Sequence, residues 1–295
     1  MNTSSKKSEV SKVLVPINTN ELTSGAVSVI GAPLVTKLEH RQSTSLGPNA
    51  IRRAIEEVFA LFSSSSHKTI EDLDTGTRRV LKPTFRMNDL GDLSSSLDKK
   101  SIVELFTFLS EKSTVPVILG GAREIGSWCS EVISELDQDC AIVHITPSIS
   151  EGDSLAGTAT FFIGVNGLMP AKAWKQTEQH NHTCVSADQI HEIGTIGTSE
   201  LLLAFLKEQK RVFWHIDVSA VDTGHAAGTP TLNIGGLDPN QILDILDHVS
   251  ENTRIAGCAL TNVAPVFDRR GLSEYFAAEV LSRVIAPVLW DRVDP

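Results

Sequence analysis

The sequence predicts an α/β fold in which a parallel β-sheet is covered by helices on both faces. Short, almost continuously apolar runs alternate along the chain with segments whose apolar residues recur at helical spacing. Glycine, proline or polar residues punctuate these runs. Strands buried on both faces lack the apolar-polar alternation of half-exposed strands, and the intervening helices supply the crossovers that parallel strands require. The order of elements therefore favours a layered α/β domain.

The first half of the chain shows this alternation clearly. The run at 26–33 ends at Gly31 and Pro33, and Pro48 suits the first turn of the helix that follows. The stretch 63–79 is polar, and we interpret it as a connection between elements. We expect strands at 26–33, 85–93 and 115–121, and helices at 47–62 and 101–113.

The second half continues the same pattern. Asp238 is a good helix cap and Pro239 a good first helical residue, so a helix should begin there. We expect strands at 140–145, 159–165, 211–217 and 254–263, and helices at 187–193, 199–209, 238–252 and 272–289. All these elements fit one domain over residues 25–295, preceded by a polar, flexible arm over residues 1–24.

Composition restricts the classes of partner. The chain has 295 residues, a hydrophobic content of 41% and a net charge of −10, which disfavours general binding to nucleic acid or anionic membranes. No apolar stretch approaches the length of a membrane span, and the first residues do not form a secretory signal. None of the four cysteines is in a Cys-x-x-Cys pair, which argues against a zinc ribbon. Reduced thiols and a cytoplasmic location are expected.

Polar residues cluster where three of the expected strands end. In open α/β sheets, ligands bind outside the carboxyl ends of the strands. The segments to consider are therefore 120–124, 144–148 and 217–222. The last of these, in "VFWHIDVSAVD", carries Asp217 and Asp222 but has Ser219 between them.

Several motifs then resemble one family over most of the chain, from about residue 27 to residue 289. They are "VIGAP", "LGPNAIRRA", "NDLGDL", "VILGGARE", "FIGVNGL", "IDVSAVD", "GTPTLNIGGL" and "LTNVAPVFD". In order and approximate spacing they resemble the ureohydrolases, a family that includes arginase, agmatinase and formiminoglutamase. The resemblance implies a three-layer arginase-like fold. It also implies a pair of manganese ions that activate a hydroxide for attack on a guanidinium or similar carbon.

The residues at the family's six metal-ligand positions differ from the implied set of four carboxylates and two histidines. These positions are occupied by Arg123, His144, Thr146, Ser148, Asp217 and Ser219. On the substrate side, Ala156 and Asn262 replace the family's histidine and acidic residue. Because only Asp217 matches, we expect no manganese, no metal cofactor and no confidently assigned catalytic residue.

Alternative interpretations of individual residues remain open. His144 and Asp217, helped by His215 or His225, could hold one transition metal, but we favour the absence of such a site. Arg123 either pairs with Asp217 in place of a metal ion or turns to solvent, leaving Asp217 to backbone donors or water. We interpret Asp222 as shaping a turn, and Asp89 and Asp92 as turn or strand-end residues.

Three functions follow from the resemblance. The preferred one is a non-catalytic arginase-like protein with a regulatory or structural role, with an active ureohydrolase relative as a candidate partner. A second form binds a small amino acid or guanidino ligand without turnover. The opposing hypothesis is an active, metal-dependent hydrolase of carbon–nitrogen bonds with a rebuilt site. The resemblance also implies a homo-oligomer, for which a trimer is preferred to a hexamer.

Overall fold

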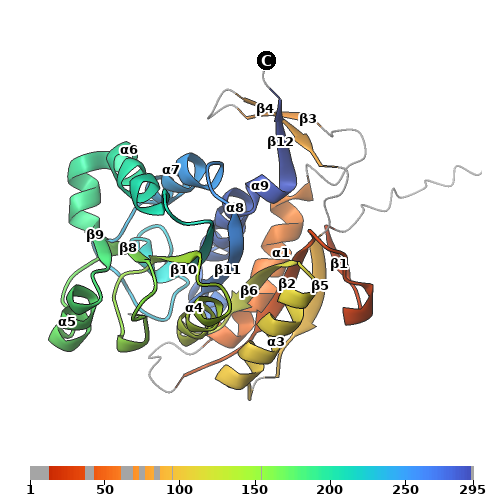
Figure 1. The fold of residues 1–295 in the computed structure, drawn as a ribbon, viewed down its shortest axis with the longest axis horizontal. Helices are drawn as coiled ribbons and strands as arrows, with labels where there is room; N and C mark the ends of the chain where they lie inside the picture. Colours follow the sequence, from red (N-terminus) through yellow and green to blue (C-terminus); the bar gives the residue numbers. More distant parts are fainter. Residues whose placement is uncertain are drawn as a thin grey trace, which may run out of the picture.

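A nine-stranded sheet runs through the molecule, and every pairing recorded between its strands is parallel. The structure, a computed structural model, describes residues 13–36, 43–60, 69–72, 77–82, 87–94, 96–153 and 155–293. The strand order is β1-β5-β2-β6-β11-β10-β7-β8-β9 (Figure 1). The strands are β1 (Leu14–Pro16), β2 (Val27–Ala32), β5 (Met87–Asp92), β6 (Val115–Gly120), β7 (Cys140–Ile145), β8 (Thr160–Val165), β9 (Thr183–Ser186), β10 (Arg211–Asp217) and β11 (Ile255–Thr261).

Helices cover both faces of this sheet, which confirms the predicted three-layer α/β architecture. On one face, α3 (Lys99–Glu111) and α4 (Glu124–Leu136) pack in a core with Ile118, Ile142 and Phe213 of the strands. The other face carries a larger core that includes Val117, Val143 and Trp214. Its helices are α1 (Gly47–Val58), α6 (Ala187–Leu206), α7 (Pro239–Ser250) and α8 (Leu272–Val284). The side chains of successive strand residues thus pack on opposite faces of the sheet, as the pleat of a buried strand requires.

Some expected elements differ in their bounds. The two helices expected at 187–193 and 199–209 form one element, α6, broken by non-helical backbone at Gly194, whose φ is 75°. Glycine adopts this conformation without the steric cost of a Cβ atom, so the chain can bend there. Helix α5 (Ala171–Gln179) and strand β9 were not predicted, because few apolar residues mark them.

The polar stretch 63–79, interpreted from the sequence as a connection, contains regular structure. Strand β3 (Thr69–Asp72) pairs antiparallel with β4 (Thr77–Leu81), and β4 pairs with the carboxyl-terminal strand β12 (Trp290–Val293). This small sheet lies at one end of the molecule, beyond α9 (Ala286–Leu289) (Figure 1). Pairing with β12, a partner far away in sequence, explains why local composition did not predict these strands.

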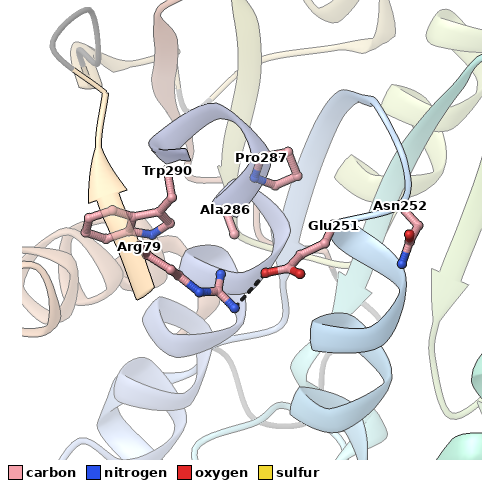
Figure 2. Close-up of a pocket in the computed structure, with 6 residues that line it drawn as sticks. All are labelled: Arg79, Glu251, Asn252, Ala286, Pro287 and Trp290. Atoms are coloured by element: carbon pink, nitrogen blue, oxygen red, sulfur yellow. Dashed lines mark ion pairs between the residues drawn. The ribbon is translucent and has the colours of Figure 1, made fainter. Parts of the chain in front are cut away.

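Arg79 links the small sheet to the main layers. Its guanidinium lies 2.7 Å from the Glu251 carboxylate, directly after α7, beside a cavity of about 290 Å³ that Trp290 also lines (Figure 2). Of the arm expected over residues 1–24, residues 1–12 lie outside the described residues, and Leu14–Pro16 forms the edge strand β1. None of the described helices has the length and apolar character needed to cross a membrane.

Candidate metal and ligand site

Four neighbouring strands deliver the polar residues to one end of the sheet. Strands β6, β11, β10 and β7 are adjacent, and their carboxyl ends carry or precede the positions singled out in the sequence. A pocket of about 150 Å³ opens there. Of the predicted site positions, it is lined by Arg123, Ser148, Asp217, Ser219 and Asn262.

The remaining predicted positions lie elsewhere. His144 is fully buried within β7, and Thr146 is buried where its hydroxyl donates to the Ser148 carbonyl, 2.9 Å away. Ala156 is exposed and is not among the residues that line this pocket. The structure therefore gathers five of the eight positions around the pocket, and the buried His144 is not among the residues that line it.

Arg123 occupies the centre of the site. It precedes α4, and its Nε lies 3.7 Å from Oδ2 of Asp217, so of the two alternatives the ion pair is the one present. The closer ionic partner is Asp153, a residue that the sequence did not single out. The guanidinium also donates to the hydroxyls of Ser148 and Ser150, at 3.0 and 2.8 Å. Arg123 therefore joins two carboxylates, one from a strand and one from a loop.

Asp217 is buried at the end of β10. Its Oδ1 accepts hydrogen bonds from the Ser219 amide and from the Asn262 side chain, both at 2.9 Å. Its Oδ2 accepts no hydrogen bond from the described residues, and neither does the neighbouring Ser219 hydroxyl. Burial raises the pKa of the Asp217 carboxyl despite the lowering effect of Arg123, because a charged group loses its hydration there.

Asp153 ends the 3₁₀ turn at Glu151–Asp153 and is fully buried. It accepts hydrogen bonds from Arg123, from the Ser127 hydroxyl and, at 2.7 Å, from the Ser150 amide. Burial raises its pKa, but the charge of Arg123 and the other neighbouring donors outweigh that effect and hold the pKa at about 2. Asp153 is therefore a charged carboxylate at neutral pH.

Two buried histidines lie side by side on neighbouring strands. His144 of β7 and His215 of β10 are register partners in the sheet, and their Nδ1 atoms are 2.9 Å apart. Nε2 of His215 lies 3.0 Å from the Thr261 hydroxyl. Burial lowers the pKa of His144 to about 4 and that of His215 well below its usual value. Both rings are therefore neutral at physiological pH.

Helix α4 passes directly over His215, and this requires a glycine. A Cβ atom at Gly126 would lie 2.0 Å from the His215 Nε2 atom. No side chain fits at that distance, so the sequence places its smallest residue where the helix crosses the ring. The imidazole of His215 is thus held between a helix backbone and the sheet.

These residues include a group that can hold a metal ion. His144, His215 and Asp153 each offer a ligand atom, and the three atoms lie within 4.8 Å of one another. Together with the manganese that the family resemblance implies, this overturns our expectation that the chain has no metal cofactor. Sequence reasoning missed the group because Asp153 reaches it from a loop and because no motif links it to the histidines.

The residues at the six family ligand positions, unlike the His144, His215 and Asp153 group, are poorly suited to binding metal ions. Arg123 carries a positive charge, and Thr146, Ser148 and Ser219 offer neutral hydroxyls, which are weak ligands for manganese. Asp217 is the carboxylate of the set, and His144 is its imidazole. This donor set does not fit two divalent ions, because it leaves most of their charge uncompensated.

The other acidic residues that we considered have structural contacts. Asp222 accepts from the amides of Gly224 and Gly235, each at 2.8 Å, which agrees with its expected role in a turn. Asp89 and Asp92 both pair with Arg52 of α1.

Comparisons with known proteins agree with the fold described above. The chain is 23% identical to formimidoylglutamase of Bacillus subtilis over 282 residues, which cover 86% of the chain and 84% of that protein. It is 24% identical to proclavaminate amidinohydrolase of Streptomyces clavuligerus over 280 residues, or 86% and 85% of the two chains. The crystal structure of the same B. subtilis formimidoylglutamase superposes with a TM-score of 0.78 at 21% identity, covering 97% of this chain and 94% of that one. The arginase family model matches residues 25–147 and 147–286, and the chain belongs to the arginase family.

Proposed function

We propose that this chain does not hydrolyse guanidino or formimino compounds by the two-manganese route and acts instead as a binding protein of the arginase family. Its role is regulatory or structural, or it consists of holding a small amino acid or guanidino ligand without turnover. The observation that carries the proposal is the position of Arg123, which lies between Asp153 and Asp217 at the carboxyl end of the sheet.

The charge of Arg123 is the physical reason. A dication about 4 Å from a guanidinium is repelled by about 8 kcal/mol at an effective dielectric constant of about 20. Asp217 is the one family carboxylate available to offset this repulsion at the six positions. Two dications held there would therefore lack the negative charge that stabilises them and that allows them to activate a hydroxide.

The pocket itself supports the binding form of this proposal. Oδ2 of Asp217 and the Ser219 hydroxyl are buried, accept no hydrogen bond from the described residues and belong to side chains that line a space of about 150 Å³. A ligand with N–H donors would satisfy both atoms. Calorimetric titration with arginine, agmatine and formiminoglutamate tests this form, and Asp217→Asn should abolish the binding.

The absence of turnover is tested by hydrolysis assays on the same three compounds. The purified chain is supplied with Mn²⁺, and an active formimidoylglutamase is assayed beside it as a positive control. We expect no product above the buffer blank. Turnover that copurifies with the folded chain and depends on added metal would contradict the proposal.

Restoration of the family ligands gives a sharper test of the same reasoning. The five-fold variant carries Arg123→His, His144→Asp, Thr146→His, Ser148→Asp and Ser219→Asp. We expect it to take up manganese where the parent chain has no two-ion uptake. If the folded variant still binds no manganese, the correspondence between these positions and the family ligands is wrong.

A second function remains in competition, because a His/Asp group is present and the similar proteins named above are enzymes. In that function the chain is an active, metal-dependent hydrolase with a rebuilt site. The two functions are distinguished by Asp153→Asn, which removes a carboxylate of the rebuilt site. Turnover that Asp153→Asn abolishes would favour the hydrolase.

The oligomeric state is a further part of the proposal. The family resemblance favours a homo-oligomer, with a trimer preferred to a hexamer. Sedimentation velocity on the full chain measures the mass directly, and a monomer at micromolar concentration would contradict this part.

A further inference from the structure

Two buried histidines and a buried aspartate form a compact group that differs from the family ligand set. His215 and Asp153 occupy none of the six ligand positions, and His144 shares one of them. All three side chains are 0% exposed. We propose that His144, His215 and Asp153 bind a single divalent transition-metal ion, with zinc as the best match.

The donor types select this class of ion. Two neutral imidazoles and one carboxylate suit zinc and similar borderline metals, whereas calcium and magnesium prefer sites made of oxygen atoms. Bonds of about 2.1 Å in tetrahedral geometry place ligand atoms about 3.4 Å apart. The ligand atoms offered by His144, His215 and Asp153 lie within 4.8 Å of one another, so a small movement of the loop that carries Asp153 brings them to this spacing.

The histidine pair has an unused hydrogen-bonding atom when it is considered without an ion. Nε2 of His144 is buried and has no hydrogen-bond partner among the described residues. A neutral ring that donates from Nδ1 to His215 leaves an unmatched lone pair at Nε2, and a ring that accepts at Nδ1 leaves an unmatched N–H there. Both tautomers are incomplete, and a buried polar group of this kind indicates a missing partner.

Neighbouring groups hold two of the three ligands, His215 and Asp153, in place. Nε2 of His215 contacts the Thr261 hydroxyl at 3.0 Å, while the Ser150 amide donates to Asp153 at 2.7 Å and the Ser127 hydroxyl also donates to it. Bonds from neighbouring groups to the far side of a ligand orient it and fix its tautomer in metal sites.

Asp153 supplies the negative charge for a cation. Its carboxylate pairs with Arg123, which also lies beside Asp217. A carboxylate accepts about four hydrogen bonds or ligands, so Asp153 can bind an ion while it keeps its contact with Arg123. Arg123 is 16% exposed and lines the pocket, which gives it room to move as an ion enters.

Metal content is the primary test, and it requires no substrate. The full chain is stripped with a chelator, exposed to Zn²⁺ and freed of unbound ions by gel filtration. We expect about one zinc per chain by elemental analysis, a higher melting temperature with zinc than without, and absorption bands of nitrogen- and oxygen-ligated cobalt when Co²⁺ is substituted. A folded chain that retains less than about a tenth of an equivalent overturns the proposal.

Variants show which residues hold the ion. Asp153→Asn and His215→Gln should weaken zinc binding about 100-fold or more, and Thr261→Val should weaken it about 10- to 100-fold. The matched control is His182→Gln, which removes a neighbouring histidine outside the group and should leave the affinity unchanged. Equal binding by wild type, Asp153→Asn and His215→Gln would overturn the assignment even if zinc is present.

Arg123→Ala separates this proposal from the one above. Removing the guanidinium should strengthen zinc binding about tenfold, because the positive charge that repels the zinc ion is then absent. Zinc uptake by this variant alone, with none by the native chain, would overturn the metal site while leaving the proposed lack of hydrolysis intact. Conversely, zinc uptake together with turnover by the native chain would support the metal site and contradict the proposed function.

Discussion

Two arginines at the same end of the sheet each join two aspartates, and they differ in burial. Arg52 of α1 pairs with Asp89 and Asp92, whose side chains are 16% and 34% exposed. Arg123 pairs with Asp153 and Asp217, which are 0% and 1% exposed. The charges are the same, yet water can solvate the first cluster and is excluded from most of the second. Residue composition alone therefore does not distinguish an ion-pair cluster that water can reach from a buried one, whose charges must be compensated by neighbouring protein groups.

Removing the guanidinium of Arg123 should have the largest effect. Arg123→Met leaves two buried carboxylates without their cation, and we expect a loss of about 3 to 5 kcal/mol in the free energy of unfolding at pH 7. Urea denaturation in the presence of a chelator measures it. Adding Asp217→Asn to this variant should recover part of the loss, since one buried charge disappears. A loss below about 1 kcal/mol would mean that the two clusters are equivalent.

Acidification should affect the Arg123 cluster next most strongly, through the histidine beside it. The pKa of His144 falls from 6.5 to about 4 on folding, so the unfolded chain binds more protons between these values. Stability is therefore full above pH 6.5 and declines by about 3 kcal/mol as the pH falls to about 4. Asp217 has the opposite effect on stability: its pKa is raised in the folded chain, so its protonation on acidification favours the folded state.

The comparison of wild type with His144→Gln isolates the histidine contribution in the metal-free chain. Stability measured by denaturation across this pH range should decline less in the variant. Parallel curves would show that His144 keeps its ordinary pKa when folded.

A methyl group at Gly126 should have an intermediate effect. Gly126→Ala places a carbon 2.0 Å from the His215 ring, so helix and ring must move apart, and we expect a cost of about 1 to 3 kcal/mol. Gly152→Ala is the control, because no atom lies within 4 Å of its added carbon. Chemical denaturation of both variants checks the expectation, and similar losses in the two would rule out a specific clash.

The smallest effect is expected at the Arg52 cluster, whose aspartates are more exposed than those of the Arg123 cluster. Arg52→Met should cost about 1 kcal/mol, because water can solvate Asp89 and Asp92 once their partner is gone. Measured beside Arg123→Met, it completes the comparison. A cost equal to that of Arg123→Met would show that burial is not what separates the two sites.

The sequence predicted the central sheet more accurately than the small one. Apolar runs such as 140–145 and 211–217 coincide with β7 and β10, because a strand buried on both faces must be apolar along its whole length. Strands β3 and β4 have no such pattern, since they pair through their backbones with each other and with β12. Their formation depends on a partner about two hundred residues away, and no local pattern encodes that.

In the candidate site too, some contacts were anticipated from the sequence and others were not. The Arg123–Asp217 pair was one of two arrangements that the sequence left open, and the carboxyl ends of the strands that carry these residues do converge. The approach of Asp153 was not predicted, because it depends on the path of the loop after β7. The facing of His144 and His215 was also not predicted, since it depends on the register between β7 and β10, which a shift of one residue would destroy.

The sequence by itself determined the α/β class, the order of the main strands and helices, and the identity of the residues at the strand ends. These follow from local periodicity, because burial constrains each segment separately. The tertiary structure decided which of those residues meet: Arg123 with Asp153, and His144 with His215. Such contacts join distant segments whose closeness is fixed by strand register and by the packing of α4, and the polar groups brought together there acquire their charge states from burial.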